Sequence, residues 1–405
     1  MLRKSIKPIV ITLTIGIMVF CYGMALVESD SVKRGQEVQI LYKDGEPLTG
    51  REAIQLLERE SEQEDPLHVT LWGRIPGQIL RCDEFNRQVE VEMIVVTGES
   101  SLLFSTRTSL GREDVNGILL SRDVAHRLLG KTSAVDIKII YEDREYIFRG
   151  IIEGAENTAV IQGSSQTPRV LDAAVIRIPE GRGQAGVIRE FEMRFWQVDG
   201  VFDLGLLGAL GNLFVLFLPM VIAGYLVLKG IKQVFLYRRT PVKAVVWMGC
   251  CVVMGLGFIL LHQGIPRVNL DFSPTMWSDF GYWQHFFSRK GDTLTRMLQG
   301  EWREPERIAL SHTWLMMQYG FVAAGIFLCF IRKLKVENCW WILLYSSGSL
   351  VAVFLVIVES GRNDFPGVWS LWGLVSFYLV AKKLLEVGAM IEEEEPRIEI
   401  VFDEQ

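Results

Sequence analysis

Long apolar runs interrupt an otherwise polar chain, and six of them are long enough, or nearly long enough, to cross a membrane. A membrane-spanning helix needs roughly 20 mostly apolar residues. The sixth run is apolar only to residue 381, and it reaches residue 385 if Lys382 and Lys383 extend their long side chains to the membrane surface. The predicted spans are residues 9–27, 204–228, 244–261, 314–331, 339–358 and 368–385.

The first apolar run has two interpretations. Arg3, Lys4 and Lys7 precede it, as basic residues precede the core of a secretory signal peptide. However, the run has 19 residues, and no clean small-x-small cleavage site follows it. Signal cores usually have only about 7–15 apolar residues. The length therefore favours an uncleaved membrane anchor over a signal peptide.

The positions of lysine and arginine predict how the spans are oriented, because these residues accumulate in cytoplasmic segments. Segment 229–243 holds five of them, whereas the short segment 359–367 holds only Arg362. Both termini are therefore expected in the cytoplasm of a multi-pass cell-membrane protein. The cytoplasmic segments are then residues 1–8, 229–243, 332–338 and 386–405, and the outer segments are residues 28–203, 262–313 and 359–367.

Residues 28–203 are too long for a linker and alternate between strand and helix patterns. Helical spacing of apolar residues predicts helices over residues 51–60, 122–129 and 186–196, the last leading directly toward the second span. Strands are predicted over residues 68–72, 89–96, 117–120, 137–141, 146–152 and 171–178. The chain is thus expected to hold an α+β extracytoplasmic domain inserted between the first and second spans of a six-helix membrane protein.

Local signals mark where some of these elements start and stop. Thr49 or Gly50 is placed to cap the first helix of the domain. Ser121 is placed to cap the second, and Gly130 follows its last residue, where helices commonly end on glycine. A charged turn over residues 142–145 is expected to join two strands as a hairpin.

Composition and charge further narrow the class of protein to which the chain can belong. The mean hydropathy of +0.24 is typical of a protein with several spans. The net charge of −6 comes from the tail 386–405, where eight acidic residues face one basic residue, which leaves the rest of the chain at about +1. Without a basic excess, the sequence predicts no nucleic-acid partner. Of six cysteines, only Cys82 lies in a polar region, so the domain is expected to fold without disulfides or metal.

Several motifs of the domain carry a family resemblance. From Gly117 to Gly130 the chain reads Gly-Ile-Leu-Leu-Ser-Arg-Asp-Val-Ala-His-Arg-Leu-Leu-Gly, and a hairpin ending in Tyr-Ile-Phe-Arg-Gly-Ile-Ile follows. Val-Thr-Leu-Trp-Gly at residues 69–73 suits the first core strand. With a span near the N-terminus, this arrangement resembles MacB/FtsX-type ABC transporter permeases with their periplasmic core domain, over about residues 1–230. Five spans are predicted after the domain, where that family usually has three.

The resemblance implies that a separate ATPase subunit uses ATP, because this chain has no complete motif for it. Gly130-Lys131-Thr132 ends like a nucleotide-binding loop, but Ala125 stands where the first glycine belongs. We find no catalytic, cofactor or metal motif, and so predict no enzyme activity and no cofactor. The ATPase would dock on the inner loop 229–243, and the alternative is a plain basic loop. The candidate docking residues are Phe235, Leu236, Tyr237, Arg238 and Arg239.

The outer segment 262–313 is rich in aromatic residues, which favour the membrane interface. One interpretation is an amphipathic or re-entrant segment on the outer leaflet, and the other is a binding lid under the extracytoplasmic domain. The candidate contact residues are Asp271, Trp277, Asp279 and Trp283.

Two functions remain open from the sequence. The first is an ABC permease subunit that couples an ATPase to movement of the outer domain, for export or mechanotransmission. The second is a membrane-anchored interaction or sensor protein that keeps the domain without transport. Membrane lipid is an expected partner in both cases, and the permease hypothesis adds a second copy or a related permease.

Overall fold

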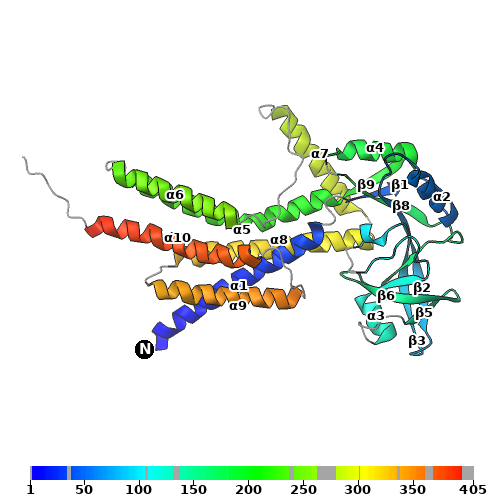
Figure 1. Ribbon diagram of the computed structural model, residues 1–405, viewed down its shortest axis with the longest axis horizontal. Coiled ribbons are helices and arrows are strands. Elements are labelled where there is room, and N and C mark those ends of the chain that lie inside the picture. Colours follow the sequence, from blue (N-terminus) through cyan, green and yellow to red (C-terminus); the bar gives the residue numbers. More distant parts are fainter. Residues whose placement is uncertain are drawn as a thin grey trace, which may run out of the picture. The chain divides into compact units, whose positions relative to one another are not determined.

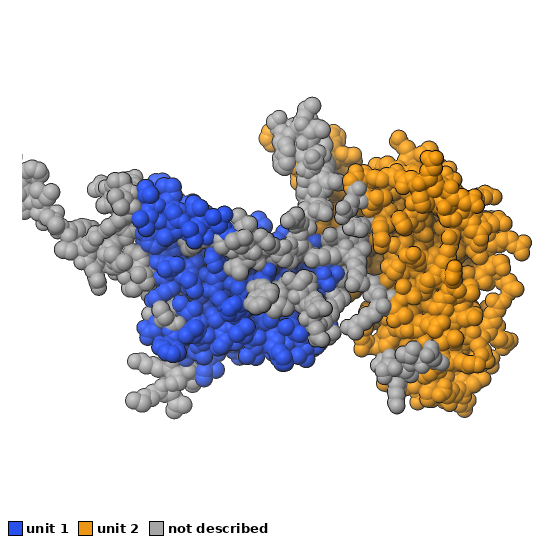
Figure 2. Space-filling view, in the orientation of Figure 1, with its two compact units in different colours: residues 1–30, 210–268, 314–405 blue, residues 31–209, 269–313 orange. Residues whose placement is uncertain are grey.

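A computed structural model (Figure 1) describes most of the chain. The chain forms two compact units, which Figure 2 shows in two colours. We call residues 1–30, 210–268 and 314–405 the helical unit, and residues 31–209 and 269–313 the sheet unit. The described residues are 2–33, 38–104, 108–130, 137–179, 181–236, 241–261, 280–300, 302–334, 338–360 and 368–394.

The sheet unit is built on a mixed sheet of nine strands, counted over the described residues. Strand β2 is the branch point, because its start pairs with β8 while residues 71–82 pair with β3. The pairings β3-β7-β4-β6-β5-β2 return to β3 and close a ring, and β8, β1 and β9 extend from β2 as an antiparallel wing. The strands are β1 Val38–Lys43, β2 Val69–Cys82, β3 Arg87–Thr97, β4 Gly117–Ser121, β5 Lys138–Tyr141, β6 Arg144–Ile152, β7 Thr158–Gln162, β8 Leu171–Arg177 and β9 Val198–Asp203.

Helices cover this sheet where the sequence patterns predicted them. In α2 (Gly50–Ser61), Thr49 and Glu52 form a capping box, and Ala53 and Leu57 are buried in the core. In α3 (Arg122–Leu129), Gly130 ends the helix with a φ of 73°, a left-handed conformation that glycine adopts without strain. Helix α4 (Gln184–Arg194) buries Phe191 against the same core.

The predicted hairpin is present, but its turn is tighter than expected. Strand β6 already begins at Arg144, so only Glu142 and Asp143 connect β5 to β6. Both residues have positive φ values, 46° and 59°. This is the conformation of the two-residue turn that matches the twist of paired strands. The expected four-residue turn 142–145 is therefore wrong in length.

The sequence patterns missed three strands, β1, β7 and β9. Strand β9 matters most, because helix 186–196 was expected to lead directly toward the second span. Instead α4 ends at Arg194, and β9 pairs with β1 before the chain enters α5 (Leu204–Leu236). Helix α5 therefore starts directly from β9, an edge strand of the sheet.

Four described helices are long and apolar enough to cross a membrane: Pro8–Asp30, Leu204–Phe235, Glu304–Lys333 and Trp340–Ser360. The predicted spans 244–261 and 368–385 coincide with helices α6 and α10, which are not among these four. The number of spans thus remains a prediction. The remaining helices are α1 Leu2–Lys33, α6 Pro241–Leu261, α7 Phe280–Gln299, α8 Glu304–Cys329, the short η3 Ile331–Lys333, α9 Cys339–Ser360 and α10 Val368–Glu394.

Some helices extend beyond the predicted spans. Helix α5 runs to Leu236, eight residues past the predicted end at residue 228, so the connection to α6 is shorter than the predicted loop. Helix α8 begins at Glu304, ten residues before the predicted start at 314. Each of these helices has residues in both units: α5 passes from the sheet unit to the helical unit after Ala209, and α8 does so after Thr313.

Within the helical unit, small residues allow close approach of helices. A Cβ added at Gly23 of α1 would lie 2.6 Å from Val356 Cγ2 of α9, so this contact needs glycine. Likewise a Cβ at Gly320 of α8 would lie 2.6 Å from the backbone oxygen of Phe214 in α5. A buried hydrogen bond adds to these contacts, as Ser29 Oγ donates to Asn212 Oδ1 at 2.8 Å. Close packing of this kind is typical of membrane helices.

Candidate functional site

Residues 302–307 form a polar segment at the start of α8 and lie within the sheet unit. The sequence Glu304-Pro305-Glu306 suits a helix start. Proline is tolerated in a first turn, and the acidic residues lie near the positive end of the helix dipole. Both carboxylates are nevertheless buried, with Glu304 5% and Glu306 1% exposed. A buried carboxylate is costly unless it is paired, so the partners of these residues define the site.

Arg303 makes the central contact of this segment. Its guanidinium donates to both carboxylate oxygens of Asp172 on β8, at 2.6 and 2.7 Å. The same guanidinium carbon lies 4.9 Å from the ring centre of Tyr42 on β1 and 5.3 Å from that of Trp72 on β2. Burial alone would lower the pKa of Arg303, but the hydrogen bonds and charge of Asp172 outweigh it and raise that pKa. Arg303 thus stays charged while it contacts three adjacent strands, β2, β8 and β1.

Tyr42 extends this contact to Glu306. Its hydroxyl donates to Glu306 Oε1. Burial raises the pKa of Glu306, and this hydrogen bond and the charge of Arg303 oppose that rise. Burial, with the negative charge of Glu306 as the next cause, raises the pKa of Tyr42 far above its usual value, so this hydroxyl keeps its proton. The four residues Asp172, Arg303, Tyr42 and Glu306 therefore form one connected network, which we call the Arg303 clamp.

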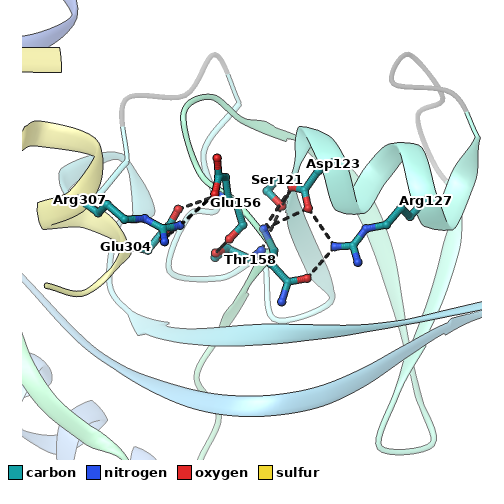
Figure 3. Close-up of polar contacts among 8 residues, drawn as sticks. Ser121, Asp123, Arg127, Glu156, Thr158, Glu304 and Arg307 are labelled. Carbon is teal, nitrogen blue, oxygen red and sulfur yellow. Dashed lines mark hydrogen bonds and ion pairs between the residues drawn. The ribbon is translucent and has the colours of Figure 1, made fainter. Parts of the chain in front are cut away.

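A second contact joins α8 to the turn between β6 and β7 (Figure 3). The backbone N–H of Glu156 donates to Glu304 Oε1 at 2.6 Å, and Arg307 Nη2 forms an ion pair with Glu304 Oε2, also at 2.6 Å. In the same turn, Gly154 has a φ of 78°, and a Cβ there would lie 3.4 Å from Ile308 Cγ2 of α8. Glycine thus suits this turn through its positive φ, while a Cβ there would be at ordinary contact distance from α8.

The same turn is also tied to the start of α3, on its other side (Figure 3). The backbone N–H of Asn157 lies 3.2 Å from both carboxylate oxygens of Asp123, and that of Thr158 donates to Ser121 Oγ at 3.0 Å. Arg127 donates to both Asp123 and Asn157. Burial alone would raise the pKa of Asp123, but the hydrogen bonds from Ser121 and Asn157 and the charge of Arg127 lower it. The turn therefore bridges α3 and α8 through charged groups.

A third contact fixes the start of α5. Asp203 ends β9, is only 4% exposed, and accepts from the backbone N–H of Leu206 at 2.9 Å. The same carboxylate accepts from Gln39 Nε2 of β1 at 2.9 Å, and Lys290 Nζ of α7 lies 3.4 Å away. Asp203 is thus an N-cap that also joins the edge strand β9 to its neighbour β1.

The three contacts have no arrangement typical of catalysis. Among the described residues, no group of three or more His, Cys, Asp or Glu side chains is placed to hold a metal ion. The sheet unit also has a cavity of about 450 Å³ between the end of α2, the start of β2 and residues 98–102 and 109–112, where His68, Glu99 and Arg112 contribute to a mixed lining. What the three contacts can do chemically is hold α5 and α8 firmly on the sheet.

The residues predicted from the sequence lie elsewhere or outside the described residues. Phe235 lies in the last turn of α5 and is 66% exposed, and Leu236 is the last residue of that helix. Trp283 lies on α7 and stacks on Phe287, with ring centres 6.0 Å apart, and it has no role in the Arg303 clamp. The remaining candidates fall outside the described residues: Tyr237, Arg238, Arg239, Asp271, Trp277 and Asp279.

Sequence reasoning missed the residues that do make the site. The run Arg303-Glu304-Pro305-Glu306-Arg307 was available as a signal, because proline and acidic residues before an apolar run indicate a helix start. Its partners carried no such signal. Asp172 and Tyr42 lie 131 and 264 residues away from Arg303 and Glu306, respectively, so no local pattern indicates that they meet.

No protein-family model and no curated protein matches the chain. Several solved structures do match part of the chain. The periplasmic region of MacB from Actinobacillus actinomycetemcomitans matches with 11% identity and a TM-score of 0.33, covering 41% of this chain and 88% of its own. The extracellular domain of the noncanonic ABC-type transporter YknZ from Gram-positive bacteria matches with 12% identity and a TM-score of 0.30, covering 40% and 99%.

A domain of a permease protein from Porphyromonas gingivalis matches as well, with 13% identity and a TM-score of 0.28 over 40% of this chain and 85% of its own. The resemblance to the MacB-like domain that the sequence predicted is thus found again among solved structures, over about two fifths of the chain.

Proposed function

We propose that this protein is the membrane subunit of an ABC-type transporter, and that it couples a separate ATPase to movement of an extracytoplasmic domain. In this proposal the sheet unit lies outside the cytoplasm and both termini lie inside. The movement serves export of a substrate or transmission of force. The sequence resemblance to MacB/FtsX-type permeases is one support, and the connections between the sheet and two long helices are the other.

The observation that carries the proposal is how stiffly the sheet is joined to α5 and α8. No residue separates β9 from α5, and Asp203 caps that helix while it holds β1. At α8 the buried Arg303 clamp fixes the first turn. A flexible linker would absorb a helix movement, whereas a continuous helix that is hydrogen-bonded to the sheet transmits it. A domain that only binds a partner would need no such connection.

On the cytoplasmic side, we propose that the ATPase docks at the end of α5 and the following residues. The exposed side chain of Phe235, with Leu236 and Tyr237 next in sequence, supplies apolar surface beside Arg238 and Arg239. Burial of apolar surface contributes about 25 cal/mol per Å², so one well-packed anchor can dominate such a contact. The partner permease subunit would be a second copy of this chain or a related protein.

The test is retrieval of the endogenous ATPase with tagged full-length protein at matched membrane levels. Changing Phe235, Leu236 and Tyr237 together to Ala should weaken retrieval by about 2 kcal/mol or more, roughly thirtyfold. A matched control changes three exposed apolar residues of the sheet unit, Ile79, Phe85 and Met193, to Ala and should retrieve the ATPase normally.

Two results would change the proposal. If the wild-type protein retrieves no ATPase, the permease function is wrong and the sensor or interaction function replaces it. If wild type and the triple variant retrieve the ATPase equally, the docking site lies elsewhere, and residues 332–337 are the next segment to change.

A further inference from the structure

Side chains of α5 and α10 meet in the helical unit around the carbonyl groups of η3, which follows the end of α8. Lys382 of α10 donates to the backbone oxygen of Arg332 at 2.8 Å, and the hydroxyl of Tyr225 on α5 donates to the same oxygen at 3.3 Å. Tyr378 donates to the backbone oxygen of Ile331 at 3.4 Å. These bonds satisfy carbonyl groups that a helix end leaves without partners.

Two ammonium groups lie over the aromatic rings of this cluster. Lys229 Nζ lies 5.2 Å from the ring centre of Tyr225, and Lys382 Nζ lies 5.7 Å from that of Tyr378. The two ring centres are 6.2 Å apart, so both cations are held in one small region. Lys382 is only 2% exposed, and the carbonyl groups of η3 accept its hydrogen bonds.

Four cations of this region have no carboxylate partner in the part of the chain that the structure describes. Among the described residues, Lys229, Lys232, Arg332 and Lys333 form no ion pair. In the sheet unit, by contrast, arginine residues such as Arg122, Arg127 and Arg194 are paired with carboxylates. Glu386 is the nearest acidic residue along α10, one turn beyond Lys382. The cluster therefore carries an excess of positive charge that the described residues leave uncompensated.

The position of the cluster along the chain suggests what compensates it. The candidate spans that contain Tyr225 and Arg332 end at Phe235 and Lys333, and the next one begins at Trp340. Trp340 is 79% exposed, as expected of an aromatic side chain at a membrane surface. The anions found at that depth are the phosphates of lipid headgroups, and arginine and lysine bind phosphate through charge-assisted hydrogen bonds.

We propose that Lys229, Lys232, Arg332 and Lys333 form a binding site for the headgroup of an anionic phospholipid. The Tyr225, Tyr378 and Lys382 network joins α5 and α10 to η3 beneath that headgroup. The site requires no ATPase and stands apart from the proposed function, because it depends only on charged residues at the ends of the candidate spans.

The acidic tail is a competing occupant, and the structure disfavours it. Helix α10 continues to Glu394, twelve residues past Lys382. At about 1.5 Å per residue, the acidic residues from Glu392 onward start about 15 Å beyond the cluster along the helix. To reach the cluster, the tail would have to fold back over this distance. A lipid headgroup does not require the chain to fold back.

The experiment uses purified full-length protein in neutral detergent, with phosphatidylglycerol, cardiolipin or zwitterionic phosphatidylcholine added. Retained lipid is counted by native mass spectrometry, and stabilisation by lipid is measured as a rise in melting temperature. Two double variants, K229Q with K232Q and R332Q with K333Q, should each lower retention of anionic lipid roughly 25-fold, because each removes two charges at about fivefold per charge. Each double variant keeps two of the four cations, so that insertion is preserved.

The control removes four exposed arginines of the sheet unit, R51Q, R59Q, R177Q and R189Q, and should retain anionic lipid as the wild type does. Retention of phosphatidylcholine to the same extent as the anionic lipids would overturn the proposal. Retention of anionic lipid at the wild-type level by both double variants would also overturn it. Equal stabilisation by inorganic phosphate alone would show that lipid is not the occupant. Binding of anionic lipid only after removal of residues 395–405 would assign the site to the tail instead.

Discussion

The carboxylate of Asp203 accepts the backbone N–H of Leu206 at 2.9 Å, so the last residue of β9 is also the cap of α5. The same carboxylate accepts a hydrogen bond from Gln39 on the neighbouring strand β1. One side chain therefore joins the edge of the sheet to the beginning of a candidate membrane span.

This double role of Asp203 leads to a first prediction. Changing Asp203 to Ala removes the cap and leaves the buried Gln39 Nε2 without its acceptor, so the melting temperature of full-length protein should fall. We expect a loss of about 2 kcal/mol, from an N-cap worth about 1 kcal/mol and an unsatisfied buried donor of similar cost. Asp203→Asn keeps an acceptor oxygen and should lose less than half as much. An equal loss in both variants would show that the charge near Lys290, and not the cap, is what matters.

The Arg303 clamp provides a second prediction, to be measured as a double-mutant cycle. Arg303→Ala leaves the half-buried Asp172 without this partner. The folded state should be weakened by about 3 kcal/mol, the low end of the range for a buried pair, because both side chains are partly exposed. Asp172→Ala should have a similar effect, and the double variant should cost less than the sum, with a coupling of about 1–3 kcal/mol. Arg303→Lys should keep only part of the stability that Arg303→Ala loses, because lysine cannot donate to both oxygens of Asp172 in the same bidentate way. Strict additivity would contradict the contact.

A third prediction concerns acid pH and Asp123. Its pKa is lower in the folded protein than in the unfolded chain, so its contribution to stability is fully present above the usual aspartate pKa of about 3.9. The contribution disappears as the pH falls below about 4 toward the lowered pKa. Asp123→Asn should therefore be less stable than wild type at pH 7, and the two melting temperatures should converge at acid pH. A difference that is constant with pH would show that the charge of Asp123 contributes nothing.

Cys82 is the subject of the fourth prediction. From its polar neighbours in sequence, one expects that Cys82→Ser would leave the melting temperature of residues 30–198 almost unchanged. The structure predicts otherwise, because Cys82 is 1% exposed and belongs to the hydrophobic core. Burying a serine hydroxyl there should cost about 1–3 kcal/mol, whereas Cys82→Ala should cost less. Thermal unfolding of full-length protein carrying each change makes the comparison, and equal melting temperatures for Cys82→Ser and wild type would disprove it.

Cys82 also illustrates what the sequence could and could not predict. Signals that act over a few residues were interpreted correctly: the Thr49 cap, the end of α3 at Gly130, and the existence of the β5–β6 hairpin. The direction in which a side chain points on a long, twisted strand is not local, and Arg81 and Asp83 beside Cys82 suggested a polar surface.

Pairing between residues that are far apart in the sequence also limited what the sequence could predict. Strand β9 is short and contains Asp199 and Gly200, so its pattern alone does not indicate a strand. It becomes one because β1, more than 150 residues earlier, provides its hydrogen-bond partners. The same reason hid the Arg303 clamp, since Asp172, Tyr42 and Trp72 come from three strands that only the folded sheet brings together.

The antiparallel pairing of β1 and β9 has a mechanical consequence. Helix α1 precedes β1 and helix α5 follows β9, so both helices attach at the same end of this strand pair. If the two helices were drawn apart, the strands would unzip one hydrogen-bonded pair at a time, beginning at Gln39 and Asp203. If both helices were pulled in the same direction, the force would act along the strands and load the β1–β8 pairing in shear. All the hydrogen bonds between β1 and β8 would then resist at once. The side-chain bond between Gln39 and Asp203 therefore reinforces the point at which the weaker mode of rupture would begin.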